Sequence, residues 1–383
     1  MQNKNISGEA GDLGIIYDSD NRFLAVGLYD PYSDICLRIL QTKNSCDINE
    51  EFIRNRFLDA LKLRAGLRQQ NTTGYRVING ENDGFPGLII DLYDDTAAVK
   101  IYTAGWTPYL NMLNAVIRDE LGARRGVLLL SGHVGRTLPP SAKRRHGDIL
   151  FGPPLDKNVR FMENGLLFQA DILHGQKTGF FLDQRENRQR IGELAKGRSV
   201  LNVFSYSGAF SIYAIAGGCR SVLEIDANRA ALQGSIDNLK LNFSQDEIDA
   251  LDFQQARGDA FKRLADLAEQ KKTFDLVILD PPAFARRKQH KKAAVQSYIR
   301  LIKAGAKRTA PGGILFAASC SAPISAKEFY RAVDYGIKSA GKKYRYMTKT
   351  RHAIDHPVTF SEGAYLKAAF CEIGVEKPNS QGV

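Results

Sequence analysis

The second half of the chain alternates between continuous apolar runs and stretches whose apolar positions have helical spacing. The runs have the length of strands that are buried on both faces, and residues 227–241 carry an apolar stripe of helical period. This alternation predicts an α/β protein with a doubly wound, mainly parallel sheet. Because ligands bind beyond the carboxyl ends of the strands in such sheets, we expect functional residues there. The predicted strands are residues 200–204, 222–226, 253–257, 274–280 and 314–319.

The first half has a different pattern. Short apolar–polar stretches at residues 13–18, 23–29 and 35–40 lie between turn residues and predict β structure, too little for a complete barrel. A helix is predicted next, over residues 50–67. The remainder of this half predicts a small α+β unit. Its elements are a strand–turn–strand at 75–91, strands at 97–102 and 127–130, a helix at 108–121 and a connector at 148–154.

Composition narrows the class of protein. The formal net charge of +11 favours a polyanionic partner. The five cysteines are odd in number and none lies in a CxxC pair, which argues against a disulfide framework and a zinc site and for a reducing compartment. No run approaches the roughly 20 apolar residues of a membrane helix, and the first residues lack the apolar core of a secretion signal. We therefore expect a cytoplasmic location, no membrane partner and no metal.

Polar residues at the first three strand ends suit an adenosyl group. The loop after the first strand is rich in small residues and lacks both a GxGxxG pattern and a Walker lysine, which disfavours a pyrophosphate. Asp226, at the second strand end, suits ribose hydroxyls, and Asp259, at the third, suits an adenine amino group. S-adenosylmethionine fits this series, although both acids could instead cap helices. The loop residues expected to bind the cofactor are Asn202, Phe204, Ser205, Tyr206, Ser207 and Gly208.

The last two predicted strands end in a carboxylate and a thiol. Asp280 opens the sequence Asp280-Pro281-Pro282, in which two prolines leave carbonyls that could face an exocyclic amino group. Asp280 itself could bind a pyrimidine ring nitrogen or the cofactor. Cys320 is the one cysteine at a predicted strand end, where nearby cations would favour a nucleophilic thiolate. The alternative is a structural cysteine.

Two further features carry candidate binding residues. Before the sheet, Lys177, Gly179 and Arg185 lie in a segment that could meet the cofactor carboxylate, or could be a simple strand-to-helix turn. A basic run comes after the Asp-Pro-Pro sequence, and further cations lie at residues 143–146 and, interleaved with aromatics, at 342–346. These runs suit phosphate contact and base stacking, or form a solvated surface. The candidate RNA-binding residues after the Asp-Pro-Pro sequence are Arg286, Arg287, Lys288, Lys291 and Lys292.

On these residues the chain resembles the bacterial and archaeal 23S ribosomal RNA cytosine-5 methyltransferases of the ribosomal RNA large subunit methyltransferase I type. The matching segments occur in family order and are specific as a set. They are residues 80–87 (GENDGFPG), 177–185 (KTGFFLDQR), 202–208 (NVFSYSG), 280–282 (DPP), 319–321 (SCS), 355–358 (DHPV) and 362–367 (EGAYLK). Two features depart from the family pattern: the segment from Asp12 resembles only the later half of a PUA fold, and Ala283 stands where the family has lysine.

The resemblance implies three parts: a partial PUA-like RNA-binding segment at residues 1–45, a linker helix with a central α+β domain at 46–155, and a Rossmann-like class I methyltransferase domain at 156–383. It also implies S-adenosylmethionine as methyl donor and a cytosine of large-subunit RNA as acceptor. Cys320 matches the family nucleophile and Asp280 the acid of the Asp-Pro-Pro motif. Asp226 and Asp259 fall where the family contacts the ribose and adenine.

The expected reaction is methylation of cytosine C5 after a thiolate adds to C6. The base that removes the C5 proton has no assigned residue; His356 is a candidate whose alternative is a structural role. Three other functions stay open: an RNA-binding ribosome-assembly factor with a vestigial methyltransferase fold, a methyltransferase of another RNA base atom, and a small-molecule methyltransferase. A homodimer is compatible with the sequence.

Overall fold

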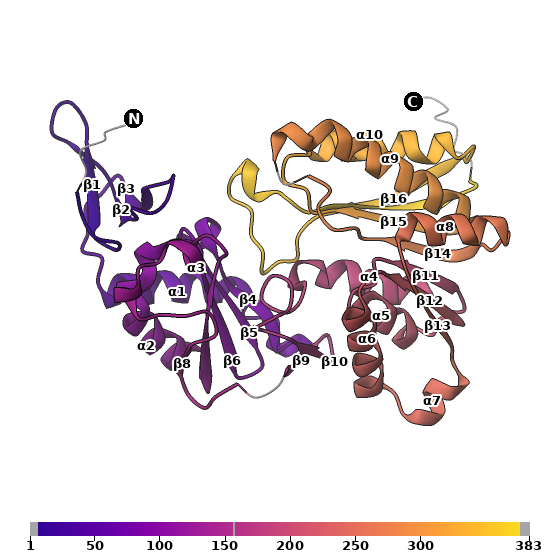
Figure 1. Ribbon diagram of the computed structural model, residues 1–383, viewed down its shortest axis with the longest axis horizontal. Helices are drawn as coiled ribbons and strands as arrows, with labels where there is room; N and C mark the ends of the chain where they lie inside the picture. The colour runs from indigo at the N-terminus through magenta and orange to yellow at the C-terminus, as the bar shows by residue number, and fades with distance from the viewer. Residues whose placement is uncertain (1–6, 156–157, 286, 376–383) are drawn as a thin grey trace. The chain divides into compact units, whose positions relative to one another are not determined.

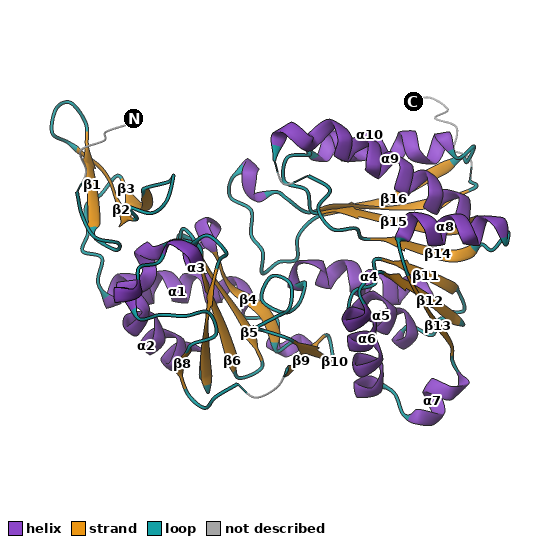
Figure 2. Ribbon diagram, viewed as in Figure 1, coloured by secondary structure: helices purple, strands orange, loops and turns teal. Residues whose placement is uncertain are grey.

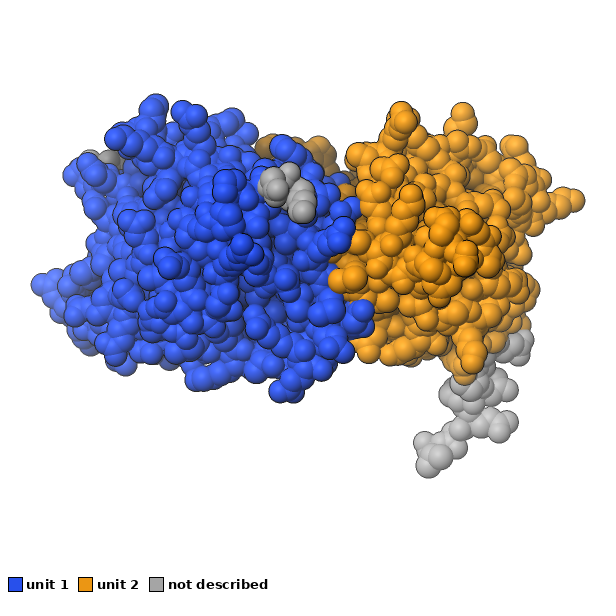
Figure 3. All heavy atoms as spheres, turned by 90° about the horizontal axis from the view of Figure 1, so that it is seen from below, with its two compact units in different colours: residues 1–165, 169–182, 354–359 blue, residues 166–168, 183–353, 360–383 orange. Residues whose placement is uncertain are grey.

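The computed structural model describes residues 7–155, 158–285 and 287–375. The chain forms two compact units, which are coloured separately in Figure 3. The first comprises Met1–Gly165, Gln169–Leu182 and Ile354–Thr359, and the second comprises Leu166–Phe168, Asp183–Ala353 and Phe360–Val383. Each unit therefore draws on segments that are distant in sequence.

Two sheets build the first unit (Figure 1). An antiparallel three-stranded sheet contains β1 (Leu13–Tyr17), β2 (Phe23–Tyr29) and β3 (Leu37–Thr42), which confirms the β structure predicted at the start. A five-stranded sheet has the order β4-β5-β6-β7-β8 and packs against helices. Its elements are β4 (Gly74–Asn79), β5 (Leu88–Tyr93), β6 (Thr96–Ile101), β7 (Arg125–Leu130), β8 (Ile149–Phe151), α1 (Glu50–Arg64), α2 (Leu110–Leu121) and α3 (Val134–Thr137).

One prediction in this unit was wrong. Residues 148–154 were expected to be a connector, yet β8 pairs antiparallel with β7 at the sheet edge. The strand has only three residues, each partly buried, so it carries no alternation that a pattern could detect. A short hairpin-like pair, β9 (Val159–Glu163) and β10 (Leu166–Ala170), comes next in the chain.

A buried charge network joins distant segments of the first unit. Arg64, at the end of α1, binds both carboxylate oxygens of Asp83 at 2.9 and 2.6 Å and donates to the carbonyl of Asp355 at 2.9 Å. The Asp355 carboxylate accepts from the backbone N–H of Arg76 at 2.8 Å and lies 3.0 Å from His356 Nδ1. Unpaired buried charges are costly, so these bonds hold Ile354–Thr359 within the first unit.

The second unit is built on one seven-stranded sheet with the order β13-β12-β11-β14-β15-β17-β16 (Figure 2). Its first five strands in this order are parallel, which confirms the predicted doubly wound sheet, while β17 runs antiparallel between β15 and β16. The strands are β11 (Ser199–Val203), β12 (Ser221–Asp226), β13 (Asp252–Arg257), β14 (Phe274–Leu279), β15 (Thr309–Ser319), β16 (Tyr344–Thr350) and β17 (Lys367–Ile373).

Alternation along the buried strands divides the apolar side chains between two helical layers. In β14, Val277 and Leu279 join a cluster with α8, α9 and α10, while Leu276 and Ile278 join another with α4 and α5. Covering both faces explains why these strands are apolar throughout. The helices of this unit are α4 (Arg185–Ala195), α5 (Ala209–Ala216), α6 (Arg229–Asn242), α7 (Gln245–Ala250), α8 (Ala260–Glu269), α9 (Lys291–Arg308) and α10 (Ala326–Ser339).

The strand order reverses beside β11. The chain moves outward from β11 to β12 and β13, then crosses back to β14 on the other side of β11. Ligands of open α/β sheets bind at the carboxyl ends of strands at such a switch point. The loops after β11, β12, β13, β14 and β15 are therefore where this fold would place a ligand.

The buried charge network predicts a large effect of one substitution. Asp83→Ala leaves the buried Arg64 guanidinium without its carboxylate, since the two side chains are 6% and 1% exposed. We expect the free energy of unfolding to fall by about 3–5 kcal/mol, measured by urea denaturation of the purified protein. The matched control is Asp59→Ala, which breaks an ion pair with Lys62 on the same helix, exposed at both ends. Its cost should be about 0–1 kcal/mol, and equal losses in the two variants would contradict the prediction.

Candidate functional site

The loop after β11 has an unusual backbone. Phe204 and Tyr206 have φ angles of 63° and 49°, in the left-handed region that non-glycine residues seldom adopt. The backbone N–H groups of Phe204 and Ser205 both reach the carbonyl of Ile225 in β12, at 2.8 and 3.2 Å. Such strained residues persist only where their surroundings hold them, and they concentrate at functional sites.

Gly208 ends this loop and begins α5 with φ +73°. A Cβ atom at this position would lie 2.0 Å from Ser235 Oγ and 2.8 Å from Glu224 Oε1. Only glycine therefore fits between the loop and the two neighbouring elements. The close approach keeps the loop backbone against the carboxyl end of the sheet.

Asp226 ties the end of β12 to the same loop. One carboxylate oxygen accepts from the backbone N–H of Tyr206 at 2.9 Å, and the other accepts from that of Asn228 at 2.8 Å. Asn228, rather than Asp226, caps α6, so the helix-cap alternative is wrong for Asp226. It is confirmed for Asp259, whose side chain accepts from Lys262 N at 3.0 Å at the start of α8. A contact of Asp259 with adenine stays a prediction.

Three polar atoms in and beside the loop have no hydrogen-bond partner among the described residues. They are Asn202 Oδ1, Ser205 Oγ and Ser207 Oγ. Asn202 is fully buried. Its amide nitrogen donates to Ser211 Oγ at 2.9 Å, whereas its amide oxygen accepts no hydrogen bond from the described residues. Buried polar atoms without partners are uncommon and costly, so they are the natural contacts of a bound polar ligand.

Glu224 is a functional candidate that the sequence pattern did not single out. It lies in β12 below the loop, fully buried, and accepts from Ser235 Oγ and Gln255 Nε2, each at 2.8 Å. Burial raises its pKa to about 7, against the opposing effect of these hydrogen bonds. The only sequence signal was an acid at an inward position of an apolar strand.

The sheet brings Asp280 and Cys320 to the same edge. β14 and β15 are parallel neighbours, with Leu279 opposite Ala317 in the register. Asp280 comes directly after Leu279, and Cys320 directly after the last residue of β15. The Cys320 thiol is partly exposed, whereas Cys219 and Cys371 are buried. A nucleophilic role for Cys320 stays a prediction.

Tyr298, on α9, is hydrogen-bonded to the segment that follows β15. Its hydroxyl lies 3.0 Å from Ser321 Oγ, and the same oxygen accepts from the N–H of Ala285 at 3.4 Å. Burial raises the pKa of Tyr298 to about 12, and the charges of Cys320 and Asp280 add to the increase. The phenol therefore lies within electrostatic range of both the thiol and the carboxylate.

Lys367 approaches Cys320 from β17. In the ladder it lies opposite Ser319, and its Nζ donates to the carbonyls of Ser321 at 2.7 Å and Tyr365 at 3.0 Å. The side chain is 1% exposed, and burial lowers the pKa of Lys367 to about 8, although the charge of Cys320 acts in the opposite direction. In the sequence this lysine belongs to a family motif but has no predicted role. The available signal was a cation at the head of an otherwise apolar strand.

The other predicted cofactor residues lie in the segment before the sheet. Arg185 is the first residue of α4 and is 2% exposed, with Glu186 3.5 Å away. Lys177 and Gly179 belong to the first unit, where both have positive φ and Thr178 between them donates to Asp91 at 2.5 Å. The preceding strand among the described residues, β10, already ends at Ala170, so this is not a direct strand-to-helix turn. Cofactor binding by these residues stays a prediction.

The basic runs differ in what they expose. Arg286 lies outside the described residues, while Arg287, Lys288 and Lys292 are exposed and Lys291 pairs with Glu328 at 2.7 Å. The run at 342–346 does not offer the expected stacking surface. Its two tyrosines are used internally, because Tyr344 is buried and the Tyr346 hydroxyl donates to Asp334 at 2.9 Å. Of its cations, Arg345 pairs with Glu372 at 2.6 Å.

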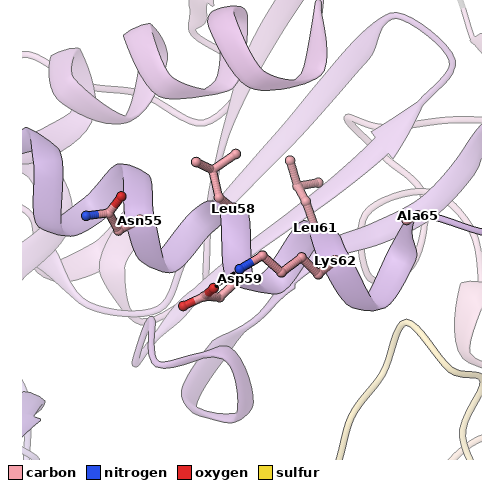
Figure 4. A pocket seen from close by; sticks show the side chains of 6 residues that line it. All are labelled: Asn55, Leu58, Asp59, Leu61, Lys62 and Ala65. Carbon is pink, nitrogen blue, oxygen red and sulfur yellow. Dashed lines mark hydrogen bonds and ion pairs between the residues drawn. The ribbon is translucent and has the colours of Figure 1, made fainter.

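Away from the strand ends, the features of the described residues that bear on other kinds of site are metal ligands, membrane helices and a surface hollow. No group of three or more possible metal ligands occurs among the described residues, and none of the helices described is long and apolar enough to cross a membrane. A surface hollow of about 630 Å³ lies along α1 in the first unit (Figure 4). It is lined by Asn55, Leu58, Asp59, Leu61, Lys62 and Ala65. The hollow holds an exposed ion pair and no nucleophile, so it does not compete with the strand ends as a reaction site.

Comparison with known proteins gives two family matches and several full-length relatives. Residues 123–334 match the model of an S-adenosylmethionine-dependent methyltransferase, and residues 1–42 match a PUA-like domain. The chain is 40% identical to a ribosomal RNA large subunit methyltransferase of Deinococcus radiodurans, over 97% of this chain and 91% of the relative. It is 34% identical to the ribosomal RNA large subunit methyltransferase I of Alteromonas mediterranea, over 95% and 90%.

Two solved structures share the fold across nearly the whole chain. One is a methyltransferase complexed with S-adenosylhomocysteine, with a TM-score of 0.81 at 22% identity, covering 96% of this chain and 93% of the other. The second is a SAM-dependent methyltransferase from Streptococcus mutans, with a TM-score of 0.80 at 21% identity, covering 97% and 94%. At these identities the likeness concerns the fold alone.

The residues present fit S-adenosylmethionine. The loop after β11 offers unpartnered polar atoms, Gly208 keeps it free of a side chain at the closest approach, and Asp226 stands at the next strand end. A pocket with an acid and neutral oxygen atoms suits ribose hydroxyls and an amino group rather than phosphates.

Gly208→Ala should weaken cofactor binding. Its methyl group would displace the loop from Ser235 and Glu224, so we expect more than a tenfold loss of S-adenosylmethionine affinity in calorimetry and a stability loss of about 2–3 kcal/mol. Gly312→Ala is the matched control, since Gly312 has φ +74° with nothing within 4 Å of its added Cβ. It should lose about 1 kcal/mol from backbone strain and bind the cofactor normally. Equal affinities in the two variants would refute the argument.

The raised pKa of Glu224 predicts that the stability of the protein depends on pH. Its folded pKa of about 7 lies above the ordinary value of 4.5, so the folded protein binds the proton more tightly. Its contribution to stability is therefore complete below about pH 4.5 and is lost as the pH rises through 7. Glu224→Gln should remove this loss, so that the difference in unfolding free energy between variant and wild type changes by about 2–3 kcal/mol in the variant's favour from pH 5 to 8.5. Parallel curves across this range would exclude the assigned titration.

Proposed function

The chain belongs to the family of S-adenosylmethionine-dependent methyltransferases that includes ribosomal RNA large subunit methyltransferase I, and on that premise we propose that it forms 5-methylcytosine in large-subunit ribosomal RNA. The observation that carries the choice of base is the placement of Asp280 and Cys320 after neighbouring parallel strands. Cytosine C5 is a weak nucleophile, and a thiol with a carboxylate beside it is a means of activating it.

Cofactor binding is proposed for the loop after β11, the acids of β12 and β13, and the segment before the sheet. Asp226 would accept from the ribose hydroxyls, and Asp259 would use the oxygen lone pairs that its helix cap leaves available. The remaining proposed contacts are Lys177, Gly179, Arg185, Asn202, Phe204, Ser205, Tyr206, Ser207, Gly208 and Asp280. When bound, S-adenosylmethionine supplies an electrophilic methyl group at a sulfonium.

The proposed reaction begins at Cys320. Its thiolate adds to C6 of the flipped cytosine. A proton taken up between Asp280 and the ring nitrogen when the base binds neutralises the negative charge that develops at that nitrogen. The electron pair released to C5 then takes the methyl group. Transfer of the C5 proton to a water molecule lets the C6–sulfur bond break and returns the thiolate. His356 is buried against Asp355 in the first unit, which favours its structural alternative over the role of proton acceptor.

RNA contact is proposed for two regions. The exposed cations Arg287, Lys288 and Lys292, with Lys291 and Arg286, would bind phosphates flanking the target base. The PUA-like segment matched at residues 1–42 is proposed as a second RNA contact. A target base has to leave its stack, or come from a loop, before the thiol can reach C6.

Cys320→Ala tests the proposal. RNA carrying 5-fluorocytosine should form a covalent adduct with the wild-type protein that survives denaturing electrophoresis, because the fluorine cannot leave as a proton does. The variant should form none, and methyl transfer to unmodified ribosomal RNA should fall at least about 10³-fold. Cys46→Ala is the matched control, an exposed cysteine distant in sequence from the site motifs, and it should keep both activities.

The outcomes separate the rival functions. Normal methylation by Cys320→Ala would indicate a methyltransferase of another base atom. Tight RNA binding without any binding of S-adenosylmethionine would indicate a ribosome-assembly factor. Weak RNA affinity that does not change with salt would indicate a small-molecule substrate, since phosphate contacts make RNA binding salt-dependent.

A further inference from the structure

The mechanism requires Cys320 to be a thiolate in a place that is already acidic. Asp280 stands at the neighbouring strand end, and Tyr298 experiences the charges of both groups. A second negative charge beside a carboxylate is unfavourable unless a cation offsets it. The sequence alone suggested the nearby cations of the basic runs for this purpose, but the fold places another cation, Lys367, against the residues that flank Cys320.

Lys367 is built into the sheet at this point. It lies opposite Ser319 in the β15–β17 ladder, one residue before Cys320, and its Nζ is 2.7 Å from the carbonyl oxygen of Ser321, one residue after it. Its second bond, to Tyr365 O at 3.0 Å, fixes the side chain from the other direction. An ammonium has three donors, and these bonds use two of them.

We infer that Lys367 is the cation that holds Cys320 as a thiolate. The step is a proton transfer in which the S–H bond of Cys320 breaks, its proton goes to solvent or to a neutral Lys367 amine, and the sulfur keeps the electron pair that adds to cytosine C6. The reason for a thiolate rests on the proposed function, whereas the alkylation experiment that tests the inference does not depend on that function. Burying an ammonium group carries a desolvation cost that two hydrogen bonds to carbonyl oxygens alone would not require.

Electrostatic reciprocity supports this role. The charge of Cys320 favours the protonated form of Lys367, and the same interaction must favour the thiolate when the lysine is charged. Because burial lowers the pKa of Lys367 to about 8, roughly nine in ten molecules carry the ammonium at pH 7, and the support is lost as the pH rises above 8.

Two titratable groups near the lysine have pKa values outside this range. Glu328 on α10 has its pKa lowered to about 2 by hydrogen bonds from Lys291 and Ser325, and that of Tyr298 is raised to about 12 by burial. His352 Nε2 accepts from the N–H of Leu366 at 3.0 Å, and the Tyr365 ring packs against it. A change in sulfur reactivity between pH 7 and 9.5 would thus report on Lys367 and Cys320 themselves.

The experiment measures alkylation of Cys320 by iodoacetamide from pH 6 to 10, in the full chain with the exposed Cys36 and Cys46 replaced by serine. In Lys367→Met the midpoint of the rate profile should rise by about one pH unit, a roughly tenfold slower reaction at pH 7. Lys367→Arg keeps the charge and should keep most of the rate. The control Lys349→Met removes an exposed lysine of the neighbouring strand, paired with Ala369 of β17, and should match the wild type.

A profile of Lys367→Met that superimposes on the wild type would overturn the inference. So would equal losses in Lys367→Met and Lys367→Arg, because the lysine would then act by fixing two carbonyls and not through its charge.

A measurement on the wild-type side chain covers the case in which Lys367→Met does not fold. The rate ratio of anionic iodoacetate to neutral iodoacetamide should fall several-fold between pH 7 and 9.5, as the ammonium beside the sulfur loses its proton. A constant ratio would overturn the inference. Alkylation results as expected from a protein that methylates no cytosine would reject the proposed function and leave the role of Lys367 standing.

Discussion

The parallel pairing of β11, β14 and β15 is the constraint on which the candidate site depends. Parallel strands end on the same side of a sheet, so the residues directly after them must meet at one edge. The register that sets Leu279 opposite Ala317 brings a carboxylate and a thiol from positions forty residues apart in sequence to neighbouring strand ends.

The two halves of the edge have different physical characters. Around the end of β11, the backbone is strained and Gly208 leaves no room for a Cβ atom. The oxygen atoms there that lack hydrogen-bond partners among the described residues would gain them from a bound polar ligand. Around the ends of β14 and β15, the hydroxyl groups of Tyr298 and Ser321 are bonded to each other, and the buried Lys367 donates to backbone carbonyls. The first half is therefore suited to binding and the second to holding reactive groups in place.

Buried charge recurs as a structural device in both units. Arg64 and Asp355 join segments 291 residues apart in the first unit, and Lys367 joins β17 to the end of β15 in the second. Each charge is satisfied by several hydrogen bonds, which is the condition under which burial of ions is tolerated. Where burial is not fully offset, as at Glu224 and Lys367, the pKa moves toward neutrality and the group gains a capacity to respond to pH.

Local pattern alone determined much of this protein. Uninterrupted apolar runs predicted five parallel strands to within one residue of their ends, except that β15 begins five residues earlier than predicted. The polar residues directly after each run predicted the site edge, because strand burial and strand ends are local properties. The antiparallel insertion of β17, the three-residue β8 and the return of Asp355 to the first unit were decided by tertiary structure. The same holds for the placement of Lys367 against the residues that flank Cys320. The burial of a lysine and the partner of its Nζ arise from pairing between distant strands, which no periodicity in the chain records.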